Sequence, residues 1–323
     1  MKAIIYEQYG PPDVLQLKDV VTPAPAENEV LIKICAASVN PYDWHFMRGD
    51  PWFIRLLLGL RKPKVTRLGF DVAGRVEAVG KNVTLLKPGD EIFGGCRGAF
   101  AEFVCADENG LALKPVNLSF EEAAAVPMAA ITALQALRDK GRIKPGQKVL
   151  VDGASGGVGT FAIQIAKSFG AEVTAVCSTR NLDRARSLGA DHIIDYTRED
   201  FTRNGQSYDL ILAANAYHSI FDYRRALSRD GICVKSGGKA SLQAMLLESL
   251  LSLMLSLFGG KKICGFIAKL HKQDMVLLKD LLEAEKIVPV IDRRYPLSDT
   301  AEAIRYLEGG HARGKVLLTV EHR

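Results

Sequence analysis

The sequence lacks the common signatures of metal-binding, disulfide-rich and nucleic-acid-binding proteins. Its six cysteines, at positions 35, 96, 105, 177, 233 and 264, include no Cys-x-x-Cys pair, which argues against a zinc knuckle or a disulfide framework. The net charge of +5 is small for 323 residues and is spread along the chain, so it does not favour nucleic acid as a partner. No charged-then-apolar leader precedes the first strand-like run, so a reducing cytoplasmic compartment is the expectation.

The composition is that of a globular protein with two domains. Hydrophobic residues make up 48% of the chain and charged residues 24%, and 323 residues are too many for one ordinary core. Up to about residue 120 the sequence contains many short strand-like runs separated by turns, which indicates a barrel-like β unit. An Ala- and Leu-rich helical pattern follows, and the spacing of Ser119 and Glu122 predicts a capping box at its start.

Strand-like and helical runs alternate from residue 147 onward. The strand-like runs cover residues 148–153, 172–178, 192–196, 208–215 and 231–238. Such alternation predicts an α/β fold with a doubly wound parallel sheet. The C-terminal part adds two helical runs, at 275–286 and 300–310, and a last strand at 314–320.

A glycine-rich turn joins the first of these strands to its helix. In VDGASGGVG, residues 151–159, the pattern Ala154-x-Gly156-x-x-Gly159 is a variant of the dinucleotide-binding GxGxxG motif. Small residues let the backbone approach a pyrophosphate, and the helix N-terminus offers free N–H groups and the positive end of its dipole. The required context, a strand before and a helix after, is present, so we interpret the turn as a phosphate site rather than an ordinary βα turn.

The next strand ends in AVCSTRN, residues 175–181, where an NAD-binding strand commonly carries an acid. An acid would bind the ribose 2′-hydroxyl of NAD but would repel the 2′-phosphate of NADP. Ser178 and Arg180 offer a hydroxyl and a guanidinium instead, and both groups suit a phosphate. The strand end therefore predicts NADPH as cofactor. The competing interpretation is that Arg180 only begins the next helix on a solvated face.

Several stretches together resemble a known family. They are GASGGVGTFAIQIAKSFGAEVTAVCSTRN, ARSLGADHIIDY, NPYDW, LGFDVAGRVEAVG and GHARGKVLL. In this order they resemble the zinc-free quinone oxidoreductase branch of the medium-chain dehydrogenase/reductase superfamily, over essentially the whole chain. The resemblance implies a GroES-like β-rich catalytic domain from residues 1–123 and 265–323, and a Rossmann NADP-binding domain from residues 124–264.

The resemblance also assigns roles to individual residues. It implies that the pyrophosphate is held by Ser155, Gly156, Gly157 and Val158, and that the adenosine phosphate is contacted by Ser178, Arg180 and Tyr196. It matches Thr132 and Lys315 to positions near the nicotinamide, and it matches Asn215 and Ser236 to other contacts with the cofactor. The candidate catalytic residues near the nicotinamide and the substrate are Asn40, Tyr42 and His45.

The chain departs from zinc-dependent relatives of this superfamily. Where they carry a Cys-then-Asp pair this chain has Asn40 and Asp43, and where they carry Gly-His-Glu it has Gly69, Phe70 and Asp71. Catalytic zinc needs three protein ligands, so we expect no metal. The proton donor stays open. Histidine is a side-chain type suited to general-acid chemistry at neutral pH, so His45 fits that role, but it also fits a histidine on a loop near the cleft. Tyr42 fits a packing aromatic as well as a proton donor.

These features predict an NADPH-dependent reductase that transfers hydride to a quinone or an α,β-unsaturated carbonyl, because such acceptors need no metal to polarise them. The alternative is a cofactor-binding protein without turnover that docks a partner or lies on a membrane. Two features keep that alternative open: the unusual active-site residue His45, and the apolar residues 241–258 of the Leu- and Met-rich segment 241–262. The segment fits a packed helix at the substrate entrance or at a homodimer interface, and it also fits a flap on a membrane with Lys261 and Lys262 toward the headgroups.

Overall fold

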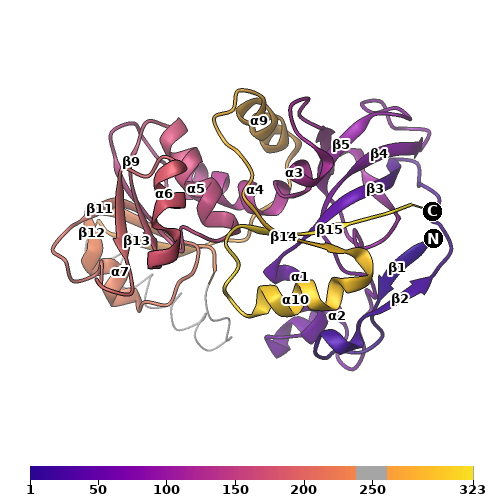
Figure 1. Cartoon of the computed structure of the whole chain (residues 1–323), viewed down its shortest axis with the longest axis horizontal. Coiled ribbons are helices and arrows are strands. Elements are labelled where there is room, and N and C mark those ends of the chain that lie inside the picture. Colours follow the sequence, from indigo (N-terminus) through magenta and orange to yellow (C-terminus); the bar gives the residue numbers. More distant parts are fainter. Residues whose placement is uncertain (238–259, 323) are drawn as a thin grey trace. The chain divides into compact units, whose positions relative to one another are not determined.

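The computed structural model describes residues 1–237 and 260–322 (Figure 1). The apolar part of segment 241–262 therefore lies outside the described residues. The chain forms two compact units. Unit 1 comprises residues 1–128, 270–285 and 289–323, and unit 2 comprises residues 129–269 and 286–288. The domain boundaries expected from the sequence were 123/124 and 264/265.

Unit 1 is built on a seven-stranded sheet in the order β14-β15-β3-β4-β5-β7, with β6 paired to β3. All of its strand pairs are antiparallel except β14 with β15. The strands of this sheet are β3 (Glu29–Val39), β4 (Asp71–Val79), β5 (Glu91–Gly95), β6 (Phe103–Asp107), β7 (Leu111–Leu113), β14 (Ile291–Pro296) and β15 (Lys315–Thr319). A separate antiparallel pair is formed by β1 (Lys2–Ile5) and β2 (Gln16–Asp19).

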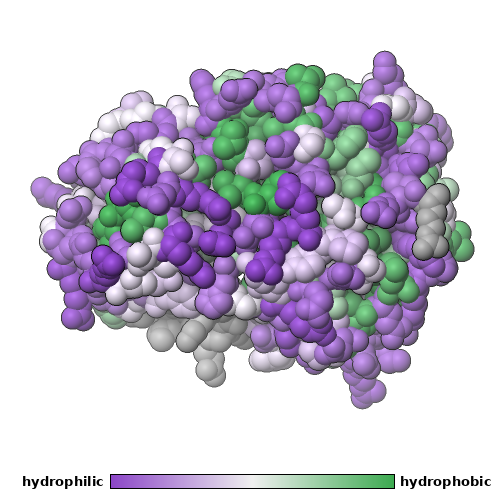
Figure 2. Space-filling model, viewed as in Figure 1, coloured by the Kyte–Doolittle hydropathy of each residue, from purple (hydrophilic) through white to green (hydrophobic). Residues whose placement is uncertain are grey.

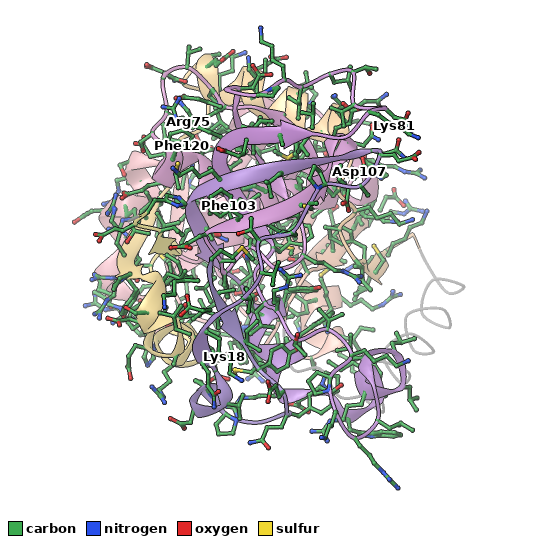
Figure 3. All side chains as sticks on the ribbon, turned by 90° about the vertical axis from the view of Figure 1, so that its right-hand side faces the viewer. Lys18, Arg75, Lys81, Phe103, Asp107 and Phe120 are labelled. Carbon is green, nitrogen blue, oxygen red and sulfur yellow. The ribbon has the colours of Figure 1, made fainter. Side chains whose placement is uncertain are left out.

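Unit 1 also contains α-helices of 4 to 12 residues. They are α1 (Pro41–Arg48), α2 (Arg55–Leu58), α3 (Phe120–Ala124), α9 (Lys272–Glu283) and α10 (Thr300–Glu308). The predicted capping box is confirmed, because the Ser119 Oγ accepts a hydrogen bond from the Glu122 N–H and the Glu122 carboxylate accepts one from the Ser119 N–H. Figure 3 shows Arg75 beside Phe120, with the guanidinium 5.4 Å from the ring centre, so α3 is fastened to β4.

Unit 2 contains a six-stranded sheet, all parallel, in the order β10-β9-β8-β11-β12-β13. Its strands are β8 (Lys148–Asp152), β9 (Glu172–Cys177), β10 (His192–Asp195), β11 (Tyr208–Ala213), β12 (Leu227–Lys235) and β13 (Lys262–Gly265). The order reverses between β8 and β11, and ligands of doubly wound sheets bind at such a switch point. The predicted parallel sheet is confirmed.

The helices of unit 2 alternate with its strands. They are α5 (Gly157–Ser168), α6 (Leu182–Ser187) and α7 (Ile220–Ala226), and α4 (Pro127–Gln135) runs from unit 1 into unit 2. Pro127 occupies the first position of α4, where the missing N–H costs nothing, and it separates α4 from α3. Among the described residues, no helix is long and apolar enough to cross a membrane. The face in Figure 2 is mainly hydrophilic and carries separate hydrophobic patches.

Candidate functional site

The glycine-rich turn of unit 2 lies at the carboxyl end of β8, at the switch point of the sheet. Gly153 has φ +82°, which favours glycine, and a Cβ atom on Gly159 would lie 2.1 Å from the Gly153 carbonyl oxygen. A Cβ atom on Gly156 would meet nothing closer than 3.6 Å, so space remains on that side of the turn. The N–H groups at the start of α5 have no intrahelical acceptors, which makes this turn a suitable cradle for a pyrophosphate.

The ends of the neighbouring strands complete this edge of the sheet. Asn215 packs against the turn so closely that a Cβ atom on Gly153 would lie 2.7 Å from the Asn215 Cβ. The Ser236 Oγ, just after β12, is buried and has no hydrogen-bond partner in the described part of the chain. A buried hydroxyl without a partner is costly, so it fits a group that receives a ligand. Thr132, on α4, is partly buried in the same unit.

The three residues assigned to the adenosine phosphate lie at two adjacent strand ends. Cys177 of β9 pairs with Asp195 of β10, so Ser178 and Tyr196 follow directly from neighbouring positions. The Tyr196 side chain is exposed, and the Ser178 Oγ accepts a hydrogen bond from Asn181 at 3.0 Å. Arg180 is exposed, and its guanidinium has no ion pair or hydrogen bond to any residue that the structure describes. This strand end therefore presents a free cation and hydroxyls, as a 2′-phosphate requires.

Asp195 is a carboxylate at this strand end that the sequence interpretation missed. It accepts hydrogen bonds from the Thr179 hydroxyl at 2.5 Å and from the Thr197 hydroxyl at 2.7 Å. These bonds, led by the one from Thr179, lower the pKa of Asp195. Its negative charge therefore opposes a bound phosphate, although both of its oxygens already have hydrogen-bond donors. The sequence Asp-x-Thr, typical of an Asx turn, was the available signal.

A second unpredicted carboxylate lies directly before the glycine turn. Asp152, the last residue of β8, is buried and accepts a 2.6 Å hydrogen bond from the Tyr223 hydroxyl. Burial raises the pKa of Asp152 to about 6, although this hydrogen bond opposes the rise. This hydrogen bond links α7 to the end of β8, directly before the glycine turn, so Asp152 helps to position the turn.

In unit 1, two predicted residues meet in a buried polar cluster. The Lys315 Nζ donates to the Asn40 Oδ1 at 2.6 Å and forms an ion pair with the Asp71 Oδ2 at 3.0 Å. The same oxygen of Asp71 accepts hydrogen bonds from the Asn40 amide at 3.0 Å and from the Ser38 hydroxyl at 2.6 Å. The Met128 N–H donates to the other oxygen at 2.8 Å. Four donors thus surround one buried carboxylate, and they fix the orientation of Asn40 and Lys315.

Asp43 supports this cluster from the first turn of α1. Its carboxylate accepts hydrogen bonds from the Asn40 N–H at 2.8 Å and from the Gly69 N–H at 3.0 Å. It is fully buried, and burial raises the pKa of Asp43 to about 7 against the lowering effect of these two donors. Asp43 therefore changes protonation near neutral pH while holding the backbone of Asn40.

Tyr42 and His45 also lie on α1, so the interpretation of His45 as a loop residue is wrong. The His45 Nδ1 lies 2.7 Å from the Asp50 carbonyl oxygen, which requires a proton on Nδ1 and leaves Nε2 as the ring nitrogen outside this hydrogen bond. Tyr42 is half-buried, 4.0 Å from Phe46 between ring centres. Burial raises the pKa of Tyr42, while hydrogen bonding and charge from Arg97 oppose the rise. The Tyr42 hydroxyl therefore keeps its proton at neutral pH.

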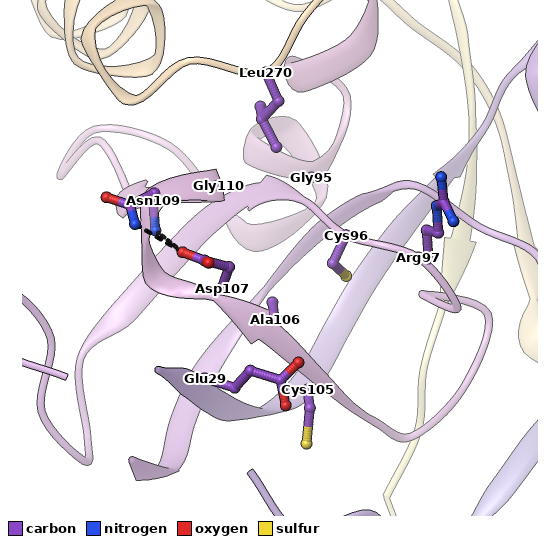
Figure 4. Close-up of a pocket in the computed structure, with 10 residues that line it drawn as sticks. All are labelled: Glu29, Gly95, Cys96, Arg97, Cys105, Ala106, Asp107, Asn109, Gly110 and Leu270. Atoms are coloured by element: carbon purple, nitrogen blue, oxygen red, sulfur yellow. Dashed lines mark hydrogen bonds between the residues drawn. The ribbon is translucent and has the colours of Figure 1, made fainter. Parts of the chain in front are cut away.

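A cavity of about 520 Å³ opens in unit 1 between the ends of β5 and β6 (Figure 4). Its lining includes Cys96, Cys105, Arg97 and Glu29. Burial raises the pKa of Cys96 to about 12 and that of Cys105 to about 11, so both thiols are protonated. Neither cysteine is a ready thiolate ligand, and the described residues include no group of three His, Cys, Asp or Glu side chains placed to hold a metal ion.

Comparison with known proteins identifies the family. Residues 26–116 match the alcohol dehydrogenase GroES-like domain, and residues 188–318 match the zinc-binding dehydrogenase family. A 2-methylene-furan-3-one reductase from Solanum lycopersicum is 37% identical over 98% of this chain and 79% of the relative. A chloroplastic quinone-oxidoreductase homolog from Spinacia oleracea is 33% identical over 98% of both chains. The quinone oxidoreductase from Coxiella burnetii has a TM-score of 0.87 and 32% identity, over 99% of both chains.

The chain is a quinone oxidoreductase-type member of the medium-chain dehydrogenase/reductase superfamily. The predicted family, the GroES-like and Rossmann fold and the oxidoreductase class are therefore confirmed. The expected cytoplasmic compartment is wrong, because curated relatives are named as chloroplastic or mitochondrial. For this quinone oxidoreductase-type chain, the absence of metal stays a prediction.

Proposed function

We propose that the chain reduces quinones or α,β-unsaturated carbonyl compounds with NADPH. The observation that carries this proposal is the exposed, unpartnered Arg180 beside Ser178 and Tyr196, on the same sheet edge as the glycine cradle. The relatives support the acceptor class, since one from Arabidopsis thaliana is named an NADPH-dependent alkenal/one oxidoreductase. Bound NADPH would supply a hydride.

The residues of unit 2 would bind and orient the cofactor. The N–H groups of Gly157 and Val158 at the start of α5 suit the pyrophosphate, and Arg180 suits the 2′-phosphate. The buried Ser236 Oγ would gain a polar partner. Thr132 and Asn215 are the remaining candidates in this unit.

The residues of unit 1 would handle the proton. Hydride addition to an enal or enone leaves an enolate, which needs a proton, and the Tyr42 hydroxyl keeps one at neutral pH. Lys315 would present a fixed donor, because its ammonium has three N–H groups and gives two of them to Asn40 and Asp71. Asn40 would orient that ammonium, since its own amide hydrogens go to Asp71 and to the Ser38 carbonyl oxygen. The His45 Nε2 is the competing proton donor, since Nδ1 is engaged by the Asp50 carbonyl oxygen.

The test is NADPH consumption, followed by absorbance, with a panel of quinones and enals and with NADH in parallel. We expect turnover with at least one class of acceptor and a preference for NADPH. Binding of NADPH without turnover on any acceptor would contradict the proposal and favour the non-catalytic alternative.

The proton donor can be tested with Tyr42→Phe, His45→Gln and the control Tyr217→Phe, an exposed tyrosine. If Tyr42 is the donor, Tyr42→Phe should lower enal reduction by about 100-fold. Quinone reduction should fall less, because a hydroquinone anion is far less basic than an enolate. Equal losses for both acceptors, or a larger loss with His45→Gln, would exclude Tyr42 as the donor.

A further inference from the structure

A short segment of unit 1 exposes large apolar side chains at unusually high density. The leucine loop, residues 50–60, includes the 3₁₀ turn Trp52–Ile54 and α2. Four of its side chains are more than half exposed: Trp52 at 63%, Leu56 at 60%, Leu57 at 82% and Leu60 at 65%. Single exposed hydrophobic residues are common, but four within nine positions mark an interaction surface.

The leucine loop is held in place, so the exposure of its leucines is built into the fold. The Arg55 guanidinium donates at 2.9 Å to the carbonyl oxygens of Arg48 and Gly49 and lies 4.6 Å from the Tyr9 ring centre. The Tyr9 hydroxyl donates to the Gly59 carbonyl oxygen at 2.7 Å. The inner side of the loop is thus tied to the body of unit 1, and α2 lies at its lower edge in Figure 1.

The charge around the leucine loop is strongly positive. Residues 48–67 contain six Lys or Arg and a single acid, Asp50. Arg48 and Arg55 have internal partners, but Arg61, Lys62 and Lys64 directly follow the loop and are exposed. One acid outside the segment, Glu7, is close enough to Lys62 for that charge to help lower its pKa, but Glu7 is already paired with Lys18 at 2.8 Å. The basic rim, Arg61, Lys62 and Lys64, therefore keeps a net positive charge.

We propose that the leucine loop and the basic rim form an interfacial binding site for anionic lipid bilayers. Trp and Leu side chains next to Lys and Arg suit the boundary between acyl chains and headgroups, because the apolar groups insert while the cations reach anionic phosphates. The basic rim selects this partner over an apolar protein surface, which would have to desolvate three cations. The proposal concerns residues other than segment 241–262 and does not depend on the reductase activity.

The test is flotation of the full-length protein with phosphatidylcholine vesicles, with and without 30% phosphatidylglycerol. We expect binding to the anionic vesicles only, and a blue shift of Trp52 fluorescence in a Trp44→Phe background. Leu57→Ser should weaken binding about tenfold or more, whereas Val116→Ser, at a residue that is 88% exposed elsewhere on unit 1, should leave it unchanged.

The charge requirement has its own matched control. Lys62→Gln with Lys64→Gln should weaken binding about 25-fold, from about fivefold per cation. Lys87→Gln with Lys144→Gln changes the net charge equally at exposed positions outside the rim and should have little effect. Because these side chains are exposed, the urea midpoints of all variants should match the wild type, which separates loss of binding from loss of folding.

Several results would overturn the proposal. The first is that the wild type does not bind anionic vesicles. The second is that binding survives Leu57→Ser or the double lysine substitution. Dissociation of an oligomer by Leu57→Ser in sedimentation, with vesicle binding unchanged, would make the leucine loop a subunit contact. A raised KM in lipid-free assays, again with vesicle binding unchanged, would make it part of a substrate entrance.

Discussion

The buried ion pair between Lys315 and Asp71 gives the sharpest prediction for unit 1. Both side chains are almost completely buried, at 4% and 0% exposure, and Asp71 accepts four hydrogen bonds. Asp71→Asn would leave a buried ammonium without its counter-charge and would turn an NH₂ group toward existing donors. Removing one partner of a buried pair costs about 3–5 kcal/mol of unfolding free energy, so we expect a loss in that range.

The assay is urea unfolding at pH 7 of Asp71→Asn, Lys315→Met and the double variant. The double variant removes both charges of the Lys315–Asp71 pair and leaves neither partner alone, so its loss should be smaller than the sum of the single losses by at least about 1.5 kcal/mol. The exposed pair of Glu7 and Lys18, in the same unit, is the control, and Glu7→Gln should cause no measurable change. Additive losses, or an Asp71→Asn variant as stable as Glu7→Gln, would refute the reasoning.

The remaining predictions concern the cofactor, pH and metal. Arg180→Ala should weaken NADPH binding by roughly 1.5–3 kcal/mol and leave NADH nearly unchanged, while Arg186→Ala should affect neither; equal losses for both cofactors would contradict the phosphate contact. Asp195→Asn should tighten NADPH binding by roughly a few-fold at low salt, because a repelling charge is removed. Burial raises the pKa of Asp43 to about 7, so the protonated carboxyl contributes its full share of folding stability only below about pH 4. That contribution is lost as the pH rises through 7. The gap in unfolding free energy between wild type and Asp43→Asn should therefore shrink from pH 5 to pH 8, and a constant gap would contradict this. Elemental analysis should find no stoichiometric zinc; one tightly bound zinc per chain would contradict the expected absence of metal.

The fold of unit 2 could be predicted because its signals are local. Strands of a parallel sheet are buried on both faces and appear as continuous apolar runs, as in β8. Helix α1 was missed because its eight residues mix aromatic, acidic and basic side chains without a clear apolar face. The signals available were Asn40 before Pro41, with Asp43 three residues after Asn40, a pattern typical of a helix start.

The cofactor edge, that is, the glycine turn and the strand ends at Ser178 and Tyr196, was predictable from local sequence, whereas the buried cluster around Asp71 was not. The glycine turn and the strand end at Ser178 each lie within one short stretch, so their residue types carried the prediction. Asp71 meets Ser38 only because β4 pairs with β3 in one particular register, and Lys315 joins them because β15 lies on the other side of β3. The family resemblance pointed to Asn40 and Lys315, but no local pattern showed that Asp71 links them. The available hints were a charged residue at the start of the apolar run of β4 and the place of Asp71 at the Gly-His-Glu position of zinc-dependent relatives.

This difference has a consequence for how variants of the two units should behave. The cofactor edge is built from turns and exposed side chains, such as Arg180, so changes there should alter affinity for NADPH with little effect on stability. The cluster around Asp71 joins three strands through buried charges, so changes there should alter stability and catalysis together. Rescue of stability by the second substitution, without rescue of turnover, would then separate the role that we propose for Lys315, a positive charge in the site, from its pairing with Asp71 in the core.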